Sequence, residues 1–443
     1  MTNYREMAEE IFRAGIAAVL PDKLIREWVH LQDSSLIIGH LKFDLSSIKN
    51  IYVIGAGKAS ALMAKEVDAI LGNQIAEGHV ITKYGHGCDL KYITLTEAGH
   101  PTPDANGVKG TSELLRIAKR AADDDLVLCL LSGGGSALMA DYPDGAQLGD
   151  LIKVNQLLVN CGADITEINT VRKHLSKVKG GQLAREVHPA QMVSFILSDV
   201  IGDPLDVIAS GPSVADSSTF QDVLEVIEKF SLEPDIPPVL LKHLIEGVAG
   251  RIPETPKYGD PIFDRVHNAI IGNCSMALEA SLKKACDLGL DTKIATTPLS
   301  GDSALMAKTI LNDALVIQRD PAIAKNVCLL FGGETTIKVT GSGLGGRNQH
   351  LALAAAIELE NKPGITLLSA GTDGTDGPTN ATGAAVDSQT IAQAKAKGID
   401  ANRYLEEFDS YHFFKKAGGH IITGPTTTNV MDMVVVIVEK INA

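Results

Sequence analysis

The chain has 443 residues, more than one hydrophobic core usually serves, so its length predicts two domains. Hydrophobic residues make up 45% of it, aromatic residues only 4%, and it contains 42 glycines, which favours an α/β protein over an all-β sandwich. Its net charge of -14 argues against a nucleic-acid or anionic-membrane surface, because either would need dense Lys and Arg facing phosphates.

The cysteines and the amino-terminal segment bear on location. None of the six cysteines forms a CxxC pair, and several lie in apolar runs, so we expect reduced cysteines and a cytoplasmic protein. The apolar run at residues 14–20 is too short to span a bilayer and follows Glu9 and Glu10, unlike the basic start of a signal peptide. We therefore expect no membrane partner, and the sequence leaves a homo-oligomer open.

The first half of the chain alternates apolar strands with helices. Residues 51–71 predict a strand that ends at Gly55 and a helix that begins near Ala59. Similar strand-turn-helix units are predicted at residues 126–140 and, less regularly, 192–204, with helices at 105–121 and 147–162. Continuous apolar strands between helices predict a Rossmann-like domain with a mostly parallel sheet covered on both faces.

A second α/β domain is predicted in the other half. Residues 249–265 contain three prolines and little apolar periodicity, so we place a boundary near residue 252, between domains 1–252 and 253–443. Beyond it, strands are predicted at residues 267–274, 292–297, 326–333, 365–371 and 433–438, with helices at 275–289, 303–318 and 348–359. Active sites in such layered sheets gather at the carboxyl ends of the strands.

The GAGKAS segment at residues 55–60 partly matches a dinucleotide fingerprint, with Ser60 in place of the third small residue. One interpretation is a helix start with a solvated lysine. The other places Lys58 at the positive end of a helix, where it would neutralise a phosphoryl group in transfer.

The SGGGSA segment that begins at Ser132 follows an apolar strand, and its three glycines with flanking hydroxyls predict an oxyanion-binding turn. A tight structural turn is the alternative. A serine hydrolase is not favoured, because Ser136 follows the glycines and does not lie between them.

Residues 171–184 concentrate positive charge in an otherwise acidic protein, at Arg172, Lys173, His174, Lys177 and Lys179. Lys173 and Lys177 are one helical turn apart, which predicts a single cationic face. Such a face is either solvated or holds a carboxylate substrate.

Five carboxylates lie at or just beyond predicted strand ends: Asp199, Asp203, Glu334, Asp373 and Asp376. Carboxylates in these places can hold Mg²⁺ or accept a proton from an attacking hydroxyl. Any one Asp in a glycine-rich loop is more often a turn residue, whose side chain bonds the local backbone. Their number favours a functional role for some of them.

Arg347 lies at the predicted start of an alanine-rich helix, where its guanidinium could bind phosphate oxygens bidentately or form a surface ion pair. Asn348 and Gln349 follow it and could bond a substrate hydroxyl or carboxylate. His100 and His420 are lone histidines near turns, for which we expect core or turn hydrogen bonding rather than catalysis.

At these loops the sequence resembles the class II glycerate kinases, the glycerate 2-kinase family whose carboxyl-terminal part is called the MOFRL domain. The matching motifs occur in family order from about Tyr52 to Ala385 and are GAGKAS, GHPTPD, SGGGSAL, VRKHLSKVKGGQLA, LSDVIGDP, ASGPS, GGETT, GLGGRNQ and GTDGTDGPTNATGA. The resemblance implies transfer of the ATP γ-phosphoryl group to the 2-hydroxyl of D-glycerate, with Mg²⁺, in a cleft between the two domains.

On the family pattern the catalytic cations are Lys58 and Arg347, one from each predicted domain. We assign the metal to Asp373 and Asp376. The residues that we expect to bind substrate or nucleotide are Gly55, Gly57, Ser132, Gly133, Gly134, Gly135, Ser136, Lys177, Asp199, Glu334, Asn348 and Gln349.

Two alternatives stay open. Members of the family have been labelled hydroxypyruvate reductases, and GAGKAS supports an NAD(P)H-dependent enzyme, but Glu77 is poorly placed to bind the ribose. A non-catalytic sensor of a phosphorylated acid is disfavoured by the many carboxylates near the cations, because like charge repels the ligand.

Overall fold

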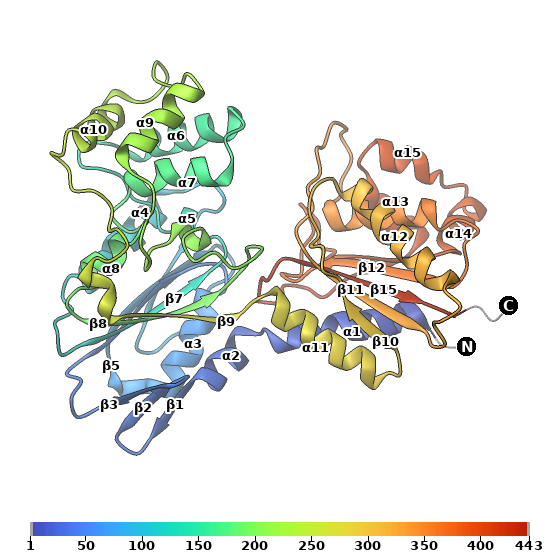
Figure 1. The fold of residues 1–443 in the computed structure, drawn as a ribbon, viewed down its shortest axis with the longest axis horizontal. Helices are drawn as coiled ribbons and strands as arrows, with labels where there is room; N and C mark the ends of the chain where they lie inside the picture. Colours follow the sequence, from blue (N-terminus) through green and yellow to red (C-terminus); the bar gives the residue numbers. More distant parts are fainter. Residues whose placement is uncertain (1–2, 441–443) are drawn as a thin grey trace. The chain divides into compact units, whose positions relative to one another are not determined.

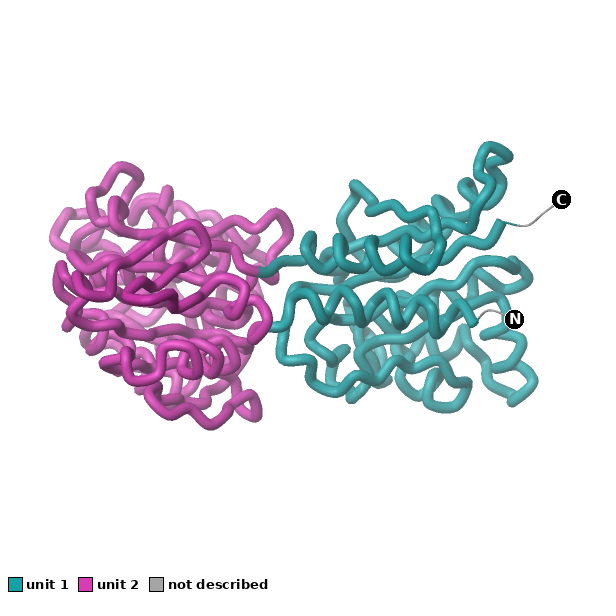
Figure 2. Tube along the Cα trace, turned by 90° about the horizontal axis from the view of Figure 1, so that it is seen from below, with its two compact units in different colours: residues 1–20, 272–443 teal, residues 21–271 magenta. Residues whose placement is uncertain are grey.

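The structure is a computed structural model that describes residues 3–440 and divides into two compact units (Figure 1). Unit 1 comprises the chain up to Leu20 together with the chain from Gly272, and unit 2 comprises Pro21–Ile271 (Figure 2, teal and magenta). Both units are layered α/β structures, which confirms the predicted fold class. Within the part of the chain that the structure describes, no helix has the length and apolarity needed to cross a membrane.

The main sheet of unit 2 has the strand order β6-β5-β4-β7-β8-β9, and its first five strands are parallel. The strands are β4 (Ile51–Ala56), β5 (Ile75–Lys83), β6 (Thr94–Ala98), β7 (Leu126–Ser132), β8 (Gln191–Leu197) and β9 (Val266–Gly272). Every residue of β4 and β7 is buried, as a sheet covered on both faces requires. From β4 the chain winds outward to β5 and β6, then returns to β7 on the other side of β4. The loops after β4 and β7 therefore lie at the topological switch point, where such sheets bind ligands.

The other elements of unit 2 are mostly helical. The helices are α2 (Pro21–Trp28), α3 (Ser60–Leu71), α4 (Ala105–Ala118), α5 (Gly135–Leu138), α6 (Leu148–Asn160), α7 (Ile165–His174), α8 (Gln182–Val187), α9 (Phe220–Lys229) and α10 (Pro238–Val248), with short 3₁₀ turns η1 (Gly72–Gln74), η2 (Ile208–Ser210) and η3 (Pro261–Arg265). A small antiparallel sheet contains β1 (Val29–Gln32), β2 (Ser35–Ile38) and β3 (Leu41–Asp44).

Four of these helices, α6, α7, α9 and α10, form a cluster with its own apolar core, seen at the top of unit 2 in Figure 1. Val154, Val171, Phe220 and Leu240 are at the centre of that core. We call this group the helical cluster.

Unit 1 contains a mixed sheet of order β10-β11-β15-β12-β13-β14. Its strands are β10 (Asp291–Ile294), β11 (Val327–Gly333), β12 (Ile365–Gly371), β13 (Gly383–Asp387), β14 (His420–Ile421) and β15 (Asp432–Val438), and its helices are α1 (Tyr4–Ala18), α11 (Cys274–Asp287), α12 (Ser303–Arg319), α13 (Arg347–Glu358), α14 (Thr390–Ala396), α15 (Ala401–Glu406) and α16 (Ser410–Ala417). The central strand β15 runs antiparallel to β11 and β12, so Asp432 pairs in register with Gly333 and with Gly371. The first residue of β15 thus lies beside the carboxyl ends of both neighbours.

The boundaries between the two units, after Leu20 and after Ile271, differ from the single boundary predicted near residue 252. The proline-containing segment 249–265 is a connection inside unit 2, because Phe263 and Val266 pack against that unit's core and β9 joins its sheet. Helix α1, which the predicted division places in the first domain, belongs to unit 1. There Ser281 Oγ donates a 3.0 Å hydrogen bond to the Ile11 carbonyl. Helix α1 packs against residues that come more than 250 positions later in the chain, so no local sequence signal predicts this contact.

Candidate active site

The two glycine-rich loops of unit 2 are hydrogen-bonded to each other at the switch point. The Lys58 N–H donates to the Gly133 carbonyl (2.9 Å), and the Ala59 N–H donates to Ser132 Oγ (3.0 Å). A Cβ at Gly57 would lie 2.0 Å from Ser132 Oγ, and one at Gly55 would lie 2.3 Å from the Leu130 carbonyl oxygen. Gly55, Gly57 and the buried Ser132 are therefore needed for close packing of the loops, and their role in binding a ligand stays a prediction.

Lys58 and Asp199 both lie close to the second glycine loop. A Cβ at Gly133 would be 1.9 Å from Asp199 Oδ2, so the small residue makes room for that carboxylate. At Gly134, whose φ is +82°, a Cβ would be 2.9 Å from the His100 ring and 3.5 Å from Lys58 Cγ. The fold thus brings together Lys58, Asp199 and the glycine loop, which sequence reasoning had placed at one edge of the sheet.

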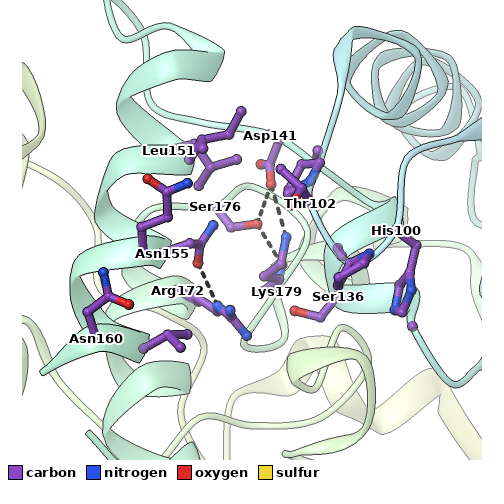
Figure 3. A pocket seen from close by; sticks show the side chains of 18 residues that line it. His100, Thr102, Ser136, Asp141, Leu151, Asn155, Asn160, Arg172, Ser176 and Lys179 are labelled. Atoms are coloured by element: carbon purple, nitrogen blue, oxygen red, sulfur yellow. Dashed lines mark hydrogen bonds and ion pairs between the residues drawn. The ribbon is translucent and has the colours of Figure 1, made fainter. Parts of the chain in front are cut away.

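A cavity of about 500 Å³ opens between these loops and the helical cluster (Figure 3). On the sheet side it is lined by the segment after β6 and the loop after β7, and on the other side by α6 and α7. The lining residues are His100, Pro101, Thr102, Pro103, Gly134, Ser136, Ala137, Ala140, Asp141, Leu151, Ile152, Asn155, Gln156, Val159, Asn160, Arg172, Ser176 and Lys179. Because they all belong to unit 2, this unit contains a preformed pocket at its switch point.

Two cations of the basic segment line this pocket. Arg172 Nε donates to Asn155 Oδ1 (2.7 Å), and burial lowers the pKa of its guanidinium. Lys179 is 5% exposed, and its Nζ donates to the Met139 carbonyl (2.7 Å) and lies 3.4 Å from Asp141 Oδ1. Burial lowers the pKa of Lys179, and the charge of Asp141 opposes that shift.

The single cationic face predicted for this segment is not formed. Helix α7 ends at His174, so Lys173 and Lys177 do not share a helical face. Lys173 is buried and pairs with Asp216 (3.1 Å), whereas Lys177 lies near the surface, pairs with Asp144 (2.6 Å) and is absent from the pocket lining. The chain past α7 turns Lys179 inward, so Arg172 and Lys179 line the pocket, whereas Lys177 does not.

His100 lines the pocket, although sequence reasoning expected a core or turn role for it. Burial lowers its pKa to about 4, and the charges of Lys58 and Lys83 act in the same direction. The ring is therefore neutral near pH 7 and adds no charge beside Lys58. His420 is confirmed in a hydrogen-bonding role, because its Nε2 lies 3.2 Å from Gln349 Oε1.

Arg347, at the start of α13, is held by two carboxylates of unit 1. Its Nε and Nη2 bond Asp432 Oδ2 and Oδ1 (2.5 and 2.9 Å), and its Nη1 lies 2.6 Å from Glu334 Oε1. Burial lowers the pKa of Arg347, but these carboxylates outweigh it and raise the pKa above its ordinary value. The side chain is 34% exposed. A guanidinium has five N–H groups, and these three bonds use three of them, so one N–H on each Nη remains for a ligand.

Asp376 holds the first turn of α13. It is 3% exposed, and its carboxylate accepts from the Asn348 N–H (3.0 Å), the Gln349 N–H (2.8 Å) and Gln349 Nε2 (3.0 Å). Asn348 and Gln349 are themselves buried, so their amides serve the protein interior and not a ligand as predicted. Asp376 satisfies backbone donors that a helix start leaves unpaired, and it thereby fixes the position of Arg347.

The predicted metal pair therefore does not fit well. Both oxygens of Asp376 accept N–H groups in a buried place, so neither is directed at a metal ion. Asp373 is half-buried, and its Oδ1 and that of Asp432 would each lie 3.4 Å from a Cβ at Gly371. Over residues 3–440, no three His, Cys, Asp or Glu side chains are grouped to hold a metal ion. Asp373 Oδ1 also accepts from the Thr375 N–H (3.0 Å) and from Thr375 Oγ1 (3.2 Å), but Asp373 is half-buried and Asp376 is buried, so Asp373 is the more accessible of the predicted pair.

Sequence reasoning missed three residues of these sites: Asp432, Asp141 and Asn155. Asp432 comes directly before the strand predicted at residues 433–438, and sequence reasoning considered only carboxylates at the ends of strands. The antiparallel direction of β15 is what brings Asp432 beside Arg347. Asn155 lies on α6 in helical spacing with Leu151, Ile152 and Val159, the face that lines the pocket. That polar residue within an apolar face was a signal that could have been used.

Comparisons with known proteins cover the whole chain. A family model described as a domain of unknown function (DUF4147) matches residues 7–245, and one described as the MOFRL family matches residues 327–432. The D-glycerate 2-kinase of Thermotoga maritima is 41% identical over 97% of both chains, and the glycerate 2-kinase of Pyrococcus horikoshii is 40% identical over 98% of both. A crystal structure of a Thermotoga maritima glycerate kinase superposes with a TM-score of 0.86 at 40% identity, covering 98% of this chain and 99% of that one.

Proposed function

We propose that this chain, which belongs to the glycerate kinase family, transfers the γ-phosphoryl group of ATP to the 2-hydroxyl of D-glycerate. The observation that carries the proposal is the pocket of unit 2. It lies at the switch point of a Rossmann-like sheet, it is lined by Arg172 and Lys179, and Lys58 lies beside its glycine loop. A small anionic acceptor and a phosphoryl group would find cations there within a largely apolar wall.

Lys58 follows β4 directly and is oriented by its backbone bond to Gly133. Its ammonium group is a compact charge that can offset the negative charge on the phosphoryl oxygens as they are transferred. Ser136, which lines the pocket and shares a 2.8 Å hydrogen bond with Ser210, offers a hydroxyl on the same side. We assign Lys58 to the transferring group and Ser136 to the acceptor.

Arg347 has the second catalytic role. Asp432 binds the guanidinium through two parallel hydrogen bonds, which leaves the outer N–H groups to bind phosphoryl oxygens. Asp432 is thus a positioning residue, and Arg347 would offset the negative charge of a transferring phosphoryl group. Glu334, on the third side of the guanidinium, balances its charge before ATP binds.

Mg²⁺ bound together with ATP would supply positive charge that offsets the charge of the phosphate oxygens. Mg²⁺ usually keeps several waters and needs only one or two protein carboxylates beside the phosphates, so a full protein cage is not required. Asp373 is the carboxylate that we assign to it.

The reductase alternative lacks support from the geometry. A dinucleotide site needs an acid at the carboxyl end of the second strand, which here is β5 and ends at Lys83. Glu77 lies near the start of that strand and pairs with Arg116 and Arg120. Its carboxylate is therefore engaged away from the switch point.

Incubation with ATP, Mg²⁺ and D-glycerate, followed by phosphorus NMR, tests the proposal. We expect the resonance of 2-phosphoglycerate together with ADP. Formation of the 3-phosphate would overturn the regiochemistry, and oxidation of NADH by hydroxypyruvate without any ATP requirement would establish the reductase instead.

A further inference from the structure

Arg172 is a partly buried cation without a carboxylate partner. Its Nε donates to the amide oxygen of Asn155 (2.7 Å), and among residues 3–440 no Asp or Glu forms an ion pair with it. The nearby Lys173 and Lys179 are also buried, but they pair with Asp216 and Asp141. Arg172 therefore differs from its neighbours in having only a neutral partner, and its side chain lines the pocket (Figure 3).

A charge that is partly removed from water and not paired costs free energy in the folded chain, so such a residue at the wall of a pocket is expected where a ligand completes the pair. The charges at this end of the pocket leave one positive charge over: Arg172 and Lys179 contribute two, and Asp141 removes one. That balance suits a monoanion. Within residues 3–440 the Nη groups of Arg172 form no hydrogen bond, and they present the planar fork that matches a carboxylate.

We propose that Arg172 binds the carboxylate of the acceptor and so restricts the enzyme to 2-hydroxy acids. Asn155 is the positioning residue that turns the guanidinium toward the pocket. The inference rests on the proposed function, because it identifies the acid end of the same acceptor whose hydroxyl lies toward Lys58. The apolar side chains of Leu151 and Ile152 in the same wall strengthen this attraction by keeping the local dielectric low.

The test compares D-glycerate with D-glyceramide, its uncharged amide, as acceptors at saturating ATP. In the wild-type chain we expect kcat/KM to favour the acid strongly. In Arg172→Gln we expect kcat/KM for the acid to fall roughly 100-fold, with little change for the amide and for the KM of ATP. Arg172→Lys should lie in between, because a point charge does not reproduce the bidentate fork.

Two further variants keep the test decisive. Lys153→Gln removes an exposed cation of α6 that does not line the pocket, and we expect the acid-to-amide ratio to stay unchanged. Asn155→Asp gives Arg172 an internal carboxylate with almost no change in shape, so it should raise the KM of D-glycerate even if Arg172→Gln folds poorly.

The outcomes separate this inference from the proposed function. If the wild-type chain phosphorylates neither acceptor, the kinase proposal fails, and calorimetric titration of D-glycerate into wild type and Arg172→Gln still tests the inference, which requires weaker binding to the variant. An unchanged acid-to-amide ratio in both Arg172→Gln and Asn155→Asp overturns the inference while leaving the kinase intact. A raised KM for ATP with an unchanged KM for D-glycerate also overturns it, because the pocket would then hold a nucleotide phosphate.

Discussion

The two units use an arginine in opposite ways. In unit 1, Arg347 is bound by Asp432 and Glu334, so its charge is more than offset and its orientation is fixed before any ligand arrives. In unit 2, Arg172 is bound only by an amide, so its charge is left for a ligand. The first arrangement suits a group that must be in place when charge develops in the transition state, and the second suits one that selects the ground-state acceptor. The partner of each guanidinium thus indicates its role.

The largest effect should come from Arg347→Ala. We expect turnover to fall by about 10³-fold or more, as for other arginines that stabilise a transferring phosphoryl group. The free energy of unfolding should also fall by about 3–5 kcal/mol, because Asp432 is left buried and unpaired.

Adding Asp432→Asn to Arg347→Ala separates these two effects. The double variant should recover much of the stability in urea denaturation but none of the turnover. Recovered turnover would show that Arg347 acts only through packing, and would remove it from the catalytic residues.

Lys58→Ala should lower turnover by roughly 10²–10³-fold, since one charge that stabilises the transferring group is lost. The loss of stability should be clearly smaller than for Arg347→Ala, because Lys58 lies on a half-buried loop at the switch point. Steady-state kinetics and urea denaturation of the two variants side by side check the contrast. Near-normal turnover would exclude Lys58 from the phosphoryl site.

The two acids of the GTDGTDG loop should respond differently. Asp376→Asn should lower the free energy of unfolding by about 1–3 kcal/mol, because a buried acceptor of four N–H groups is replaced in part by a donor. Its Mg²⁺ titration should be unchanged. Asp373→Asn should raise the Mg²⁺ concentration needed for half-maximal activity with little loss of stability, and the reverse pattern would restore Asp376 as the metal ligand.

The smallest effect concerns pH and His100. Its pKa is about 4 in the folded chain, below the ordinary histidine value of 6.5, so the unfolded chain takes up the proton more readily. The contribution of His100 to the free energy of unfolding is therefore fully present above pH 6.5 and is lost as the pH falls toward 4. His100→Gln should show a smaller loss of unfolding free energy between pH 7.5 and pH 5 than the wild type. Identical pH dependence in the two proteins would contradict the buried, neutral state of His100.

Local sequence signals predicted much of this molecule. Apolar runs that end in glycine correctly placed β4, β7, β11 and β12, and they placed Lys58 and Asp199 beside one glycine loop. These features depend on neighbours in sequence and on the general rule that parallel strands share a carboxyl edge.

The features that were missed depend on tertiary pairing. Helical periodicity could not show that α7 ends at His174 and that the next residues turn Lys179 inward, away from the surface position of Lys177. Nor could it show that β15 runs antiparallel between two other strands and brings Asp432 to Arg347. In both cases the decisive partner is tens of residues away, and no local pattern specifies it.

Helix α1 belongs to unit 1, although the rest of that unit comes after Ile271. During synthesis, unit 2 leaves the ribosome with all its strands while Ile11 and Phe12 of α1 still lack the helix and strands that bury them. Unit 1 can close its core only after β15 has been synthesised, so the chain is expected to acquire its two halves in sequence, with unit 2 first. A truncated variant that begins at Gly272 would lack α1 and so would not contain the whole of unit 1. A circular permutant in which the residues up to Leu20 are joined to the segment from Gly272 would contain all of it.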